Sequence, residues 1–385
     1  MRVWICQLAE LRILLWYWGR RGAGGQLTLA LAEALARQPG VRVALAISAQ
    51  AELRPELVAL GLPTEAVPTY ASAVGFLAGF LRLPWLGWRL RRQARRFHAD
   101  AVVSVMTHLW TPLVAPWLRR AGLRFIPMVH DALPHPGDPD WLWNWRLNAE
   151  LDAASAAIAL SDAVAVALRG RRPGLAVQRL PLGAHLPPAL LTAAPGTRLA
   201  GPGPRFLMFG RMRAYKGLDL LRDAWPLLRV QCPDASLLVV GEGDPEALAP
   251  GLTALPSVRV EPRWLTEAEI PGLIAAADAV VLPYWEASQS GVVSLAHALG
   301  VPVVVTPVGG LAEQVCDGVD GTVAAAVTPV ALAAAMARLG DPATRAALAA
   351  GARDSGLALC DWDAQARALV TALGFMTKHE GPRPR

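Results

Sequence analysis

Short apolar runs alternate with amphipathic helical segments along the first half of the chain. A run of this kind, ending in polar or turn residues, is typical of a buried strand in a parallel sheet. A helical period fits residues 27–37, directly after a cluster of glycines. The pattern predicts repeated βα units with strands at residues 2–8, 41–47, 101–105, 125–129, 156–160 and 176–180.

The same alternation restarts in the second half and predicts a second Rossmann-like domain. Thr266 and Glu269 have the spacing of a capping box for a helix that ends near Ala277. Expected strands lie at residues 205–209, 236–240, 280–282 and 303–306, and expected helices at 218–230 and 291–299. We expect an N-terminal Rossmann-like domain at 1–190, a Pro-, Gly- and Ala-rich linker at 191–204, a C-terminal Rossmann-like domain at 205–375 and a disordered tail at 376–385.

The length of the chain agrees with two domains, and its positive charge is concentrated in one segment. A chain of 385 residues is longer than one hydrophobic core usually serves, which agrees with two domains. Much of the formal charge of +6 is concentrated near Trp85 and Trp88. Cations mixed with amphipathic rings suit an anionic membrane surface, although a solvated helix is an equal alternative. The arginines concerned are Arg82, Arg89, Arg91, Arg92, Arg95 and Arg96.

Other classes of site find little support. The four cysteines are far apart, and the two DxD strings at 138–140 and 361–363 are short enough to occur by chance, so we predict no metal site. The uncharged stretch 67–81 is too short to span a bilayer. We therefore expect a cytoplasmic protein, peripheral at most on the inner face of the cell membrane, with no nucleic-acid partner.

A basic loop after the strand 205–209 is the strongest candidate for anion binding. It places Gly210, Arg211 and Lys216 between a strand and a helix, where cations and a helix N-terminus can hold a phosphate together. Lys216 is one of only two lysines among 37 basic residues, which indicates a point-charge role that arginine would not fill. A solvated basic turn is the alternative.

Ser290 and Gly291 form a second helix start that suits an anion, although an ordinary N-cap would look alike. Glu286 lies just before them, where a carboxylate can accept hydrogen bonds from sugar hydroxyls. In the first half, His108 and His130 follow strands, and the carboxyl ends of parallel strands are where ligands bind.

Glycines 22, 24 and 25 also precede a helix, but they do not fit the GxGxxG fingerprint, and we predict no nicotinamide binding.

Taken in order, these segments resemble the retaining family 4 glycosyltransferases of the GT-B fold over nearly the whole chain. The matching strings are Phe-Gly-Arg at 209–211, Tyr-Lys-Gly at 215–217, Val-Val-Gly-Glu-Gly at 239–243, residues 277–284, Gly-Val-Pro at 300–302 and Gly-Gly-Leu-Ala-Glu at 309–313. The resemblance implies an α/β protein with two Rossmann-like, doubly wound parallel-sheet domains that face a cleft. It also implies that the domain at 1–190 holds the acceptor and that the domain at 205–375 binds the nucleotide sugar.

It also implies a diphosphate grip by Arg211 and Lys216, with Gly210, Ser290, Gly291 and Glu313 on the donor side. Gly24 and Gly25 correspond to the N-terminal glycine loop, and His130 and Glu286 to groups that contact the donor sugar. The chain departs from the usual pattern at Leu295, where the family often has a glutamate, and so resembles a Ser-Gln-Ser-Gly variant subgroup.

The implied function is transfer of a sugar from a nucleotide diphosphate to a hydroxyl of a saccharide or lipid-linked saccharide. The resemblance implies retention of anomeric configuration, with no metal and no cofactor other than the donor. An anionic membrane surface would be contacted through residues 82–96. A nucleotide-sugar epimerase of the same fold and a non-catalytic nucleotide-sugar- or saccharide-binding protein are the alternatives.

Overall fold

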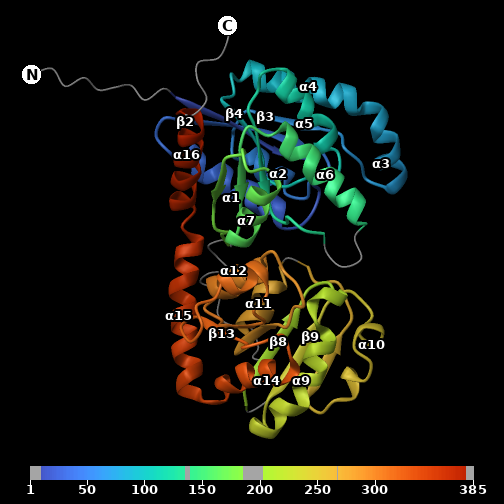
Figure 1. The fold of residues 1–385 in the computed structure, drawn as a ribbon, viewed down its shortest axis with the longest axis vertical. Coiled ribbons are helices and arrows are strands. Elements are labelled where there is room, and N and C mark those ends of the chain that lie inside the picture. Colours follow the sequence, from blue (N-terminus) through green and yellow to red (C-terminus); the bar gives the residue numbers. More distant parts are fainter. Residues whose placement is uncertain (1–9, 135–138, 185–202, 267, 379–385) are drawn as a thin grey trace, which may run out of the picture. The chain divides into compact units, whose positions relative to one another are not determined.

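A computed structural model describes residues 10–134, 139–184, 203–266 and 268–378 of the chain. These residues form two compact units, each around its own parallel sheet (Figure 1). Among the described residues, the first unit comprises 10–134, 139–181 and 361–378, and the second comprises 182–184, 203–266 and 268–360. The α/β class and the two doubly wound sheets expected from the sequence are confirmed.

The first unit contains a seven-stranded sheet in the order β3-β2-β1-β4-β5-β6-β7, with all neighbours parallel. Its strands are β1 Leu11–Tyr17, β2 Val41–Ser48, β3 Thr64–Val67, β4 Ala101–Ser104, β5 Phe125–Val129, β6 Ala157–Ala159 and β7 Val177–Arg179. Its helical elements are α1 Ala23–Ala36, α2 Arg54–Ala59, α3 Ala73–Gly79, η1 Phe80–Arg82, α4 Leu83–Arg96, α5 Thr111–Arg120, α6 Asp140–Ala153, α7 Asp162–Arg171 and α16 Trp362–Lys378.

The first strand lies later than its sequence pattern suggested. The expected strand at residues 2–8 falls outside the described residues, and the strand before the glycine turn is β1. Arg12 lies at the beginning of β1 and forms an ion pair with Glu10 at 3.0 Å. Both charges are half-buried at the strand's end, and the apolar run Ile13–Tyr17 follows them.

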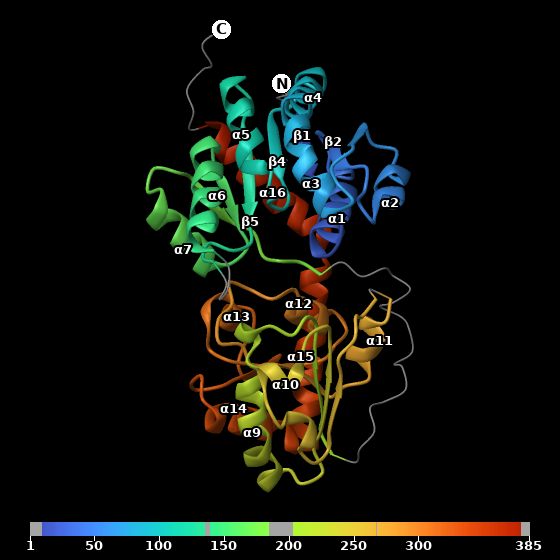
Figure 2. The ribbon, with the colours of Figure 1, turned by 90° about the vertical axis from the view of Figure 1, so that its right-hand side faces the viewer.

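The second unit contains a six-stranded parallel sheet in the order β10-β9-β8-β11-β12-β13. Figure 2 labels helices of this unit, drawn in yellow to red. Its strands are β8 Arg205–Phe209, β9 Ser236–Val240, β10 Val258–Glu261, β11 Ala279–Leu282, β12 Val303–Val305 and β13 Gly321–Val323. Its helical elements are η2 Ala214–Lys216, α9 Leu218–Gln231, α10 Pro245–Leu248, η3 Leu252–Ala254, α11 Ile270–Ala275, α12 Gly291–Ala298, α13 Gly309–Glu313, α14 Pro329–Ala337, η4 Arg338–Gly340 and α15 Pro342–Cys360. The predicted strands and helices of this half are confirmed to within a residue or two at most ends.

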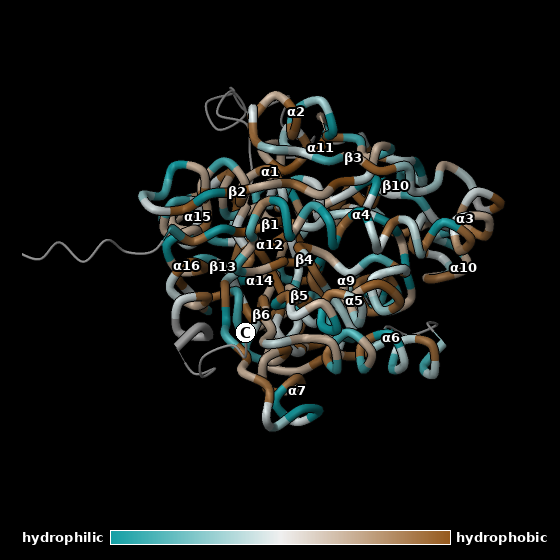
Figure 3. The backbone as a smooth tube through the Cα atoms, turned by 90° about the horizontal axis from the view of Figure 1, so that it is seen from above, coloured by the Kyte–Doolittle hydropathy of each residue, from teal (hydrophilic) through white to brown (hydrophobic). Residues whose placement is uncertain are grey.

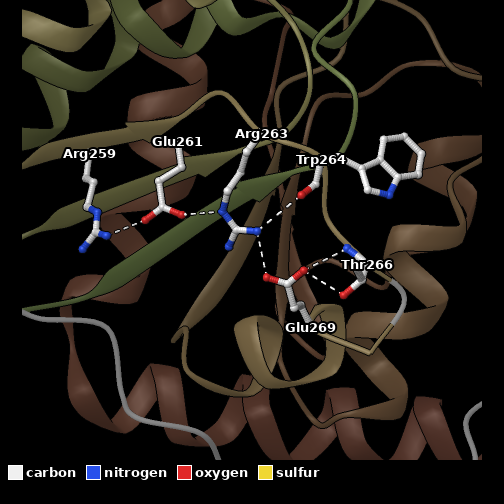
Figure 4. A network of polar contacts seen from close by, with 6 residues as sticks. All are labelled: Arg259, Glu261, Arg263, Trp264, Thr266 and Glu269. Carbon is white, nitrogen blue, oxygen red and sulfur yellow. Dashed lines mark hydrogen bonds and ion pairs between the residues drawn. The ribbon is translucent and has the colours of Figure 1, made fainter.

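The expected capping box near Thr266 forms only in part (Figure 4). Glu269 accepts hydrogen bonds from the backbone N–H of Thr266 at 2.9 Å and from its hydroxyl at 2.7 Å, and Arg263 donates to the same carboxylate. These bonds lower the pKa of Glu269 to about 2. The helix α11 nevertheless begins only at Ile270, so the pair closes the turn between β10 and α11 and does not cap the helix.

The final helix groups with the first unit and not with the expected C-terminal domain at 205–375. Ala366, Leu369 and Leu373 of α16 are fully buried, and α16 contacts α1. Arg37 at the end of α1 also pairs with Asp363 at 2.9 Å. The helix extends to Lys378, so residues 376–378 of the expected disordered tail are helical. The remainder of that tail, and most of the expected linker at 191–204, lie outside the described residues.

Glu150 of α6 is a fully buried carboxylate within the first unit. One of its oxygens accepts a hydrogen bond from the Thr107 hydroxyl at 2.9 Å. Burial raises the pKa of Glu150 from about 4.5 to about 8, against the opposing effects of this hydrogen bond and of the Arg146 charge. The folded chain therefore holds a proton on Glu150 at a pH where the unfolded chain has lost it.

Glu150 should therefore lower the free energy of unfolding by about 1.4 kcal/mol per pH unit between pH 4.5 and 8, since the native state keeps the extra proton on its carboxyl there. Glu150→Gln, which cannot ionise, should remove this slope and exceed the wild type in stability at pH 8 but not at pH 4.5. Urea unfolding at several pH values measures the slope. Glu56→Gln, at an exposed carboxylate on α2, serves as the control. An unchanged slope in Glu150→Gln would rule Glu150 out as its source.

Candidate functional site

The loop after β8 is anchored to the end of the neighbouring strand β9. The Gly210 N–H donates to the Val240 carbonyl at 2.9 Å, and the Met212 N–H donates to the Glu242 carbonyl at 2.8 Å. The Met212 side chain is buried, whereas that of Arg211 is exposed. The loop therefore has a fixed backbone and presents its cations at the carboxyl edge of the sheet, as expected from the sequence.

Lys216 folds back over the beginning of its own loop. Its ammonium lies 5.5 Å from the centroid of the Tyr284 ring, and a Cβ placed on Gly210 would be 3.1 Å from Nζ. Burial lowers the pKa of Lys216, and the nearby Arg211 charge lowers it further. Within the described part of the chain, neither cation forms an ion pair with a carboxylate. The two positive charges are thus close together and uncompensated, which favours an anionic ligand.

A close backbone approach holds this loop against the loop that follows β11. Gly217 has a φ of 67°, and a Cβ there would lie 1.8 Å from the Pro283 carbonyl oxygen, so only glycine fits. The Trp285 N–H donates to the Tyr215 carbonyl at 2.8 Å, and its indole N–H donates to Asp219 at 2.9 Å. The two loops are therefore held as one structure.

Tyr284 connects the lysine to the start of α12. Its ring is buried beneath the Lys216 ammonium, and its hydroxyl forms a hydrogen bond with the Ser290 side chain. Burial raises the pKa of Tyr284 to about 12, so the hydroxyl stays protonated. The Thr306 hydroxyl donates to the Tyr284 carbonyl at 2.5 Å. Lys216 and Ser290, 74 positions apart in the sequence, thus lie on opposite parts of one side chain.

The N-terminus of α12 faces open space. Ser290 is its N-cap, with a hydroxyl that accepts from the Val292 N–H at 3.3 Å. The side chain of Gln314 donates to the Ser290 carbonyl and accepts from its N–H, at 3.1 and 2.7 Å. A Cβ on Gly291 would have no atom within 4 Å. A rigidly held helix start with room in front of it suits a phosphate.

The two glutamates expected in the site lie on neighbouring loops of the second unit. Glu286 is half-buried between Trp285 and Ala287. Glu313 is exposed at the end of α13, directly before Gln314. The first residue of α13, Gly309, packs so closely that a Cβ there would lie 2.1 Å from the Ala287 carbonyl oxygen. The structure therefore gathers Gly210, Arg211, Lys216, Glu286, Ser290, Gly291 and Glu313 around the carboxyl ends of β8, β11 and β12.

In the first unit, Gly24 and Gly25 are buried in the first turn of α1. A Cβ on Gly24 would lie 2.8 Å from the Met106 sulfur and 2.8 Å from the Tyr17 ring. Packing of α1 against the ends of β1 and β4 therefore requires glycine at this position. A role of these glycines in ligand binding remains a prediction.

Two histidines follow strands of the same sheet. One ring nitrogen of His130, Nε2, is 3.3 Å from the Val105 carbonyl oxygen, and burial lowers the pKa of His130 despite the adjacent Asp131. The pKa of His108 falls to about 4, chiefly by burial, and its Nδ1 accepts from the Trp110 N–H at 3.2 Å. Both rings are therefore neutral near pH 7.

Two contributors to this site were missed by the sequence analysis. Tyr284 was included only as the last residue of the matching string 277–284, and Gln314 was not considered. The local sequence around Tyr284 and Gln314 gave no signal of these roles, because the contacts of Tyr284 with Lys216 and of Gln314 with Ser290 join segments that are distant in sequence. The aspartates of the second DxD string have structural roles: Asp361 accepts from the Ala364 N–H at the start of α16, and Asp363 pairs with Arg37. Asp138 lies outside the described residues.

The described residues contain no group of three or more His, Cys, Asp or Glu side chains placed to hold a metal ion. None of the described helices is both long enough and apolar enough to cross a membrane.

Gly217→Ala should destabilise the second unit strongly, because it adds a clash with Pro283 to the cost of a left-handed backbone. Gly251 provides a matched control, since it has a φ of 82° and no atom within 4 Å of a Cβ. Gly251→Ala should cost about 1–2 kcal/mol for the backbone alone, and Gly217→Ala about 1–3 kcal/mol more. Urea denaturation of the full chain measures both. Equal losses in the two variants would contradict the close approach.

Comparison with known proteins agrees with this geometry. Residues 24–181 match the family model described as Glycosyltransferase Family 4, and residues 203–341 match the model described as Glycosyl transferases group 1. A D-inositol 3-phosphate glycosyltransferase from Xylanimonas cellulosilytica is 30% identical over 332 residues, which cover 76% of each chain. A GDP-mannose-dependent alpha-(1-6)-phosphatidylinositol monomannoside mannosyltransferase from Mycolicibacterium smegmatis is 32% identical over 185 residues, 45% of this chain and 48% of the relative.

Among solved structures, sucrose-phosphate synthase from Thermosynechococcus elongatus aligns with a TM-score of 0.71 and 20% identity over 96% of this chain and 100% of that one. HepE from Anabaena, in complex with UDP-glucose, aligns with a TM-score of 0.69 and 20% identity over 95% of this chain and 100% of that one. The sequence relatives and the shared fold lead to one conclusion. The chain belongs to the family 4 glycosyltransferases of the GT-B fold and is a glycosyltransferase.

Proposed function

We propose that the chain transfers a sugar from a nucleotide diphosphate to a hydroxyl of a saccharide or lipid-linked saccharide, with retention of anomeric configuration and without a metal ion. One observation supports a donor that contains a diphosphate. Lys216 is held near the N-terminus of α12 through Tyr284, and Arg211 lies on the same loop; neither cation has a carboxylate partner in the described part of the chain. HepE, which shares the fold, was solved with UDP-glucose.

The chemical role of this grip is to stabilise the leaving group. When the bond from the sugar to the diphosphate breaks, negative charge grows on the phosphate oxygens. Lys216 and the start of α12 would face that charge without reorganising, because Tyr284 and Gln314 already hold them. The exposed Arg211, on the same loop as Lys216, would add its charge. Burial makes the Lys216 charge costly in the empty site, and a bound diphosphate would offset that cost.

The same arrangement supports the proposal that no metal ion is needed. Two cations and a helix N-terminus supply the charge stabilisation that a divalent ion would otherwise provide. The retaining outcome is carried over from the family resemblance. Glu286 and His130 are proposed to contact the donor sugar, Glu286 as a hydrogen-bond acceptor and His130 as a neutral imidazole. Gly24 and Gly25 would allow the backbone of the first unit to approach the ligand.

Leu295 stands where the family often has a glutamate. Its side chain is half-buried and packs against the apolar core of the second unit. No carboxylate is present there to bind a ribose, so the nucleotide must be recognised by other groups. The relatives do not agree on one donor: HepE was solved with UDP-glucose, and the mycobacterial mannosyltransferase is GDP-mannose-dependent.

A thermal-shift screen of UDP, GDP and ADP and their sugars should identify one nucleotide that raises the melting temperature. A ligand at 100 times its Kd adds about 2.7 kcal/mol to the free energy of unfolding. The shift should persist in the presence of a chelator and should be lost in Lys216→Ala. A shift that needs a divalent cation would contradict the metal-free proposal.

With the donor identified, Lys216→Ala should lower kcat/KM by about 100-fold or more, because a contact to developing charge is lost. Release of the nucleoside diphosphate in the presence of acceptor saccharides measures turnover. Arg259→Ala, at an exposed arginine of β10 in the same unit, should stay within a few-fold of wild type. If Lys216→Ala also stays within a few-fold, the proposed diphosphate grip is wrong.

A further inference from the structure

The helix α3 presents an apolar face to solvent. Val74, Leu77 and Leu81 are 77%, 67% and 87% exposed, and their spacing of three and four positions places them on one side of the continuous α3–η1 segment. The α3 part of the backbone, at the right-hand edge of Figure 3, is drawn in brown and pale shades. Three adjacent exposed aliphatic side chains are unfavourable in water and indicate a binding surface.

This exposure is built into the fold. On the other side of α3, the Phe76 ring stacks on Trp110, with centroids 5.5 Å apart and planes at 12°. Gly79 lies so close to the same ring that a Cβ would be 2.3 Å from it. Trp110 itself is fully buried in the core of the first unit. The helix is therefore held rigidly by one face, with its aliphatic face turned outward.

The next helix, α4, combines exposed tryptophans with arginines. Its inward face is buried through Leu86 and Leu90. Trp85 and Trp88 are 42% and 46% exposed. The Arg89 guanidinium lies 5.2 Å from the Trp85 ring centroid, and that of Arg92 lies 5.1 Å from the Trp88 ring centroid. Rings that are apolar on one side and polar at an edge, beside long cationic side chains, are suited to the boundary between lipid and water.

The charge of this surface has one sign. Between Glu65 and Asp100 the sequence contains no acidic residue, and the ion pair of Glu65 is with Arg89. The exposed arginines of η1 and α4 are Arg82, Arg92, Arg95 and Arg96. Such a surface attracts an anionic partner by long-range electrostatics, which salt screens.

We propose that α3, η1 and α4 form a membrane-docking surface for an anionic lipid bilayer. Val74, Leu77 and Leu81 enter the boundary between headgroups and acyl chains, Trp85 and Trp88 lie at the headgroup level, and the exposed arginines contact lipid phosphates. The lipid surface fits better than an acidic protein, because aliphatic insertion and diffuse positive charge occur together and neither forms a shaped pocket. Association is reversible, since the segment is short and only partly apolar.

Co-sedimentation of the full chain with vesicles tests the proposal. Vesicles of phosphatidylcholine alone are compared with vesicles containing about equal parts of phosphatidylcholine and phosphatidylglycerol, at about 0.1 M and about 0.5 M salt. We expect binding to the anionic vesicles, weaker binding at the higher salt concentration, and little binding to the neutral ones. Equal binding to both kinds of vesicle, or to neither, overturns the proposal.

Two sets of variants separate the apolar and electrostatic parts. The triple variant Arg82→Gln, Arg92→Gln, Arg96→Gln should lower partitioning to anionic vesicles by about 100-fold, at about five-fold per arginine. The double variant Leu77→Ser, Leu81→Ser should also lower it, and should leave the residual binding more sensitive to salt. Their melting temperatures are compared with wild type to show that both variants fold.

Matched controls come from other parts of the surface. Val230→Ser with Leu357→Ser removes two aliphatic side chains that are 84% and 68% exposed in the second unit. Arg54→Gln, Arg259→Gln and Arg367→Gln together remove three exposed arginines elsewhere. If these controls lose binding as much as the docking variants, the surface is not specific. The docking variants should keep the nucleotide thermal shift of wild type, so that failure of this proposal and failure of the donor proposal are distinguishable.

Discussion

The close approach of Gly217 to the Pro283 carbonyl is the contact on which the donor side of this protein depends. It sets the start of α9 against the loop after β11, and so places the Tyr284 ring beneath the Lys216 ammonium. The hydroxyl of the same tyrosine reaches the cap of α12. Binding groups from three segments are thus fixed by one backbone contact that any side chain at residue 217 would prevent. Rigidity of this kind keeps like charges close together before a ligand arrives, at the expense of stability in the empty protein.

Local features of this site were predictable, and contacts between distant segments were not. The positions of Arg211, Lys216 and Ser290 follow from turn residues between a strand and a helix, which are readable within a window of about ten residues. Gln314 forms two hydrogen bonds with the Ser290 backbone from 24 positions away, and no sequence pattern near either residue predicts that contact. The ion pair of Glu10 with Arg12, at the beginning of β1, is a local contact, but no sequence pattern near these residues predicts it.

The two units distribute their charges differently. The second unit concentrates uncompensated positive charge at one edge of its sheet, in the loop after β8. The first unit spreads arginines along α4 and keeps a protonated carboxyl, Glu150, in its interior. A concentrated site suits a small, highly charged ligand, and a spread surface suits a large one. The net charge of the chain therefore includes contributions from two different features, a concentrated cationic loop after β8 and a spread cationic surface on α4.

The membership of α16 in the first unit has a consequence for the order in which the chain is completed during synthesis. Residues 10–181 leave the ribosome first, yet the helix that covers part of α1 follows only after all of the second unit. Until then, the part of α1 that contacts α16 lacks this helix as a partner. Synthesis of the first unit therefore starts before that of the second unit and ends after it. During this interval, the incomplete first unit exposes a surface that chaperones or a folding intermediate of the second unit can contact.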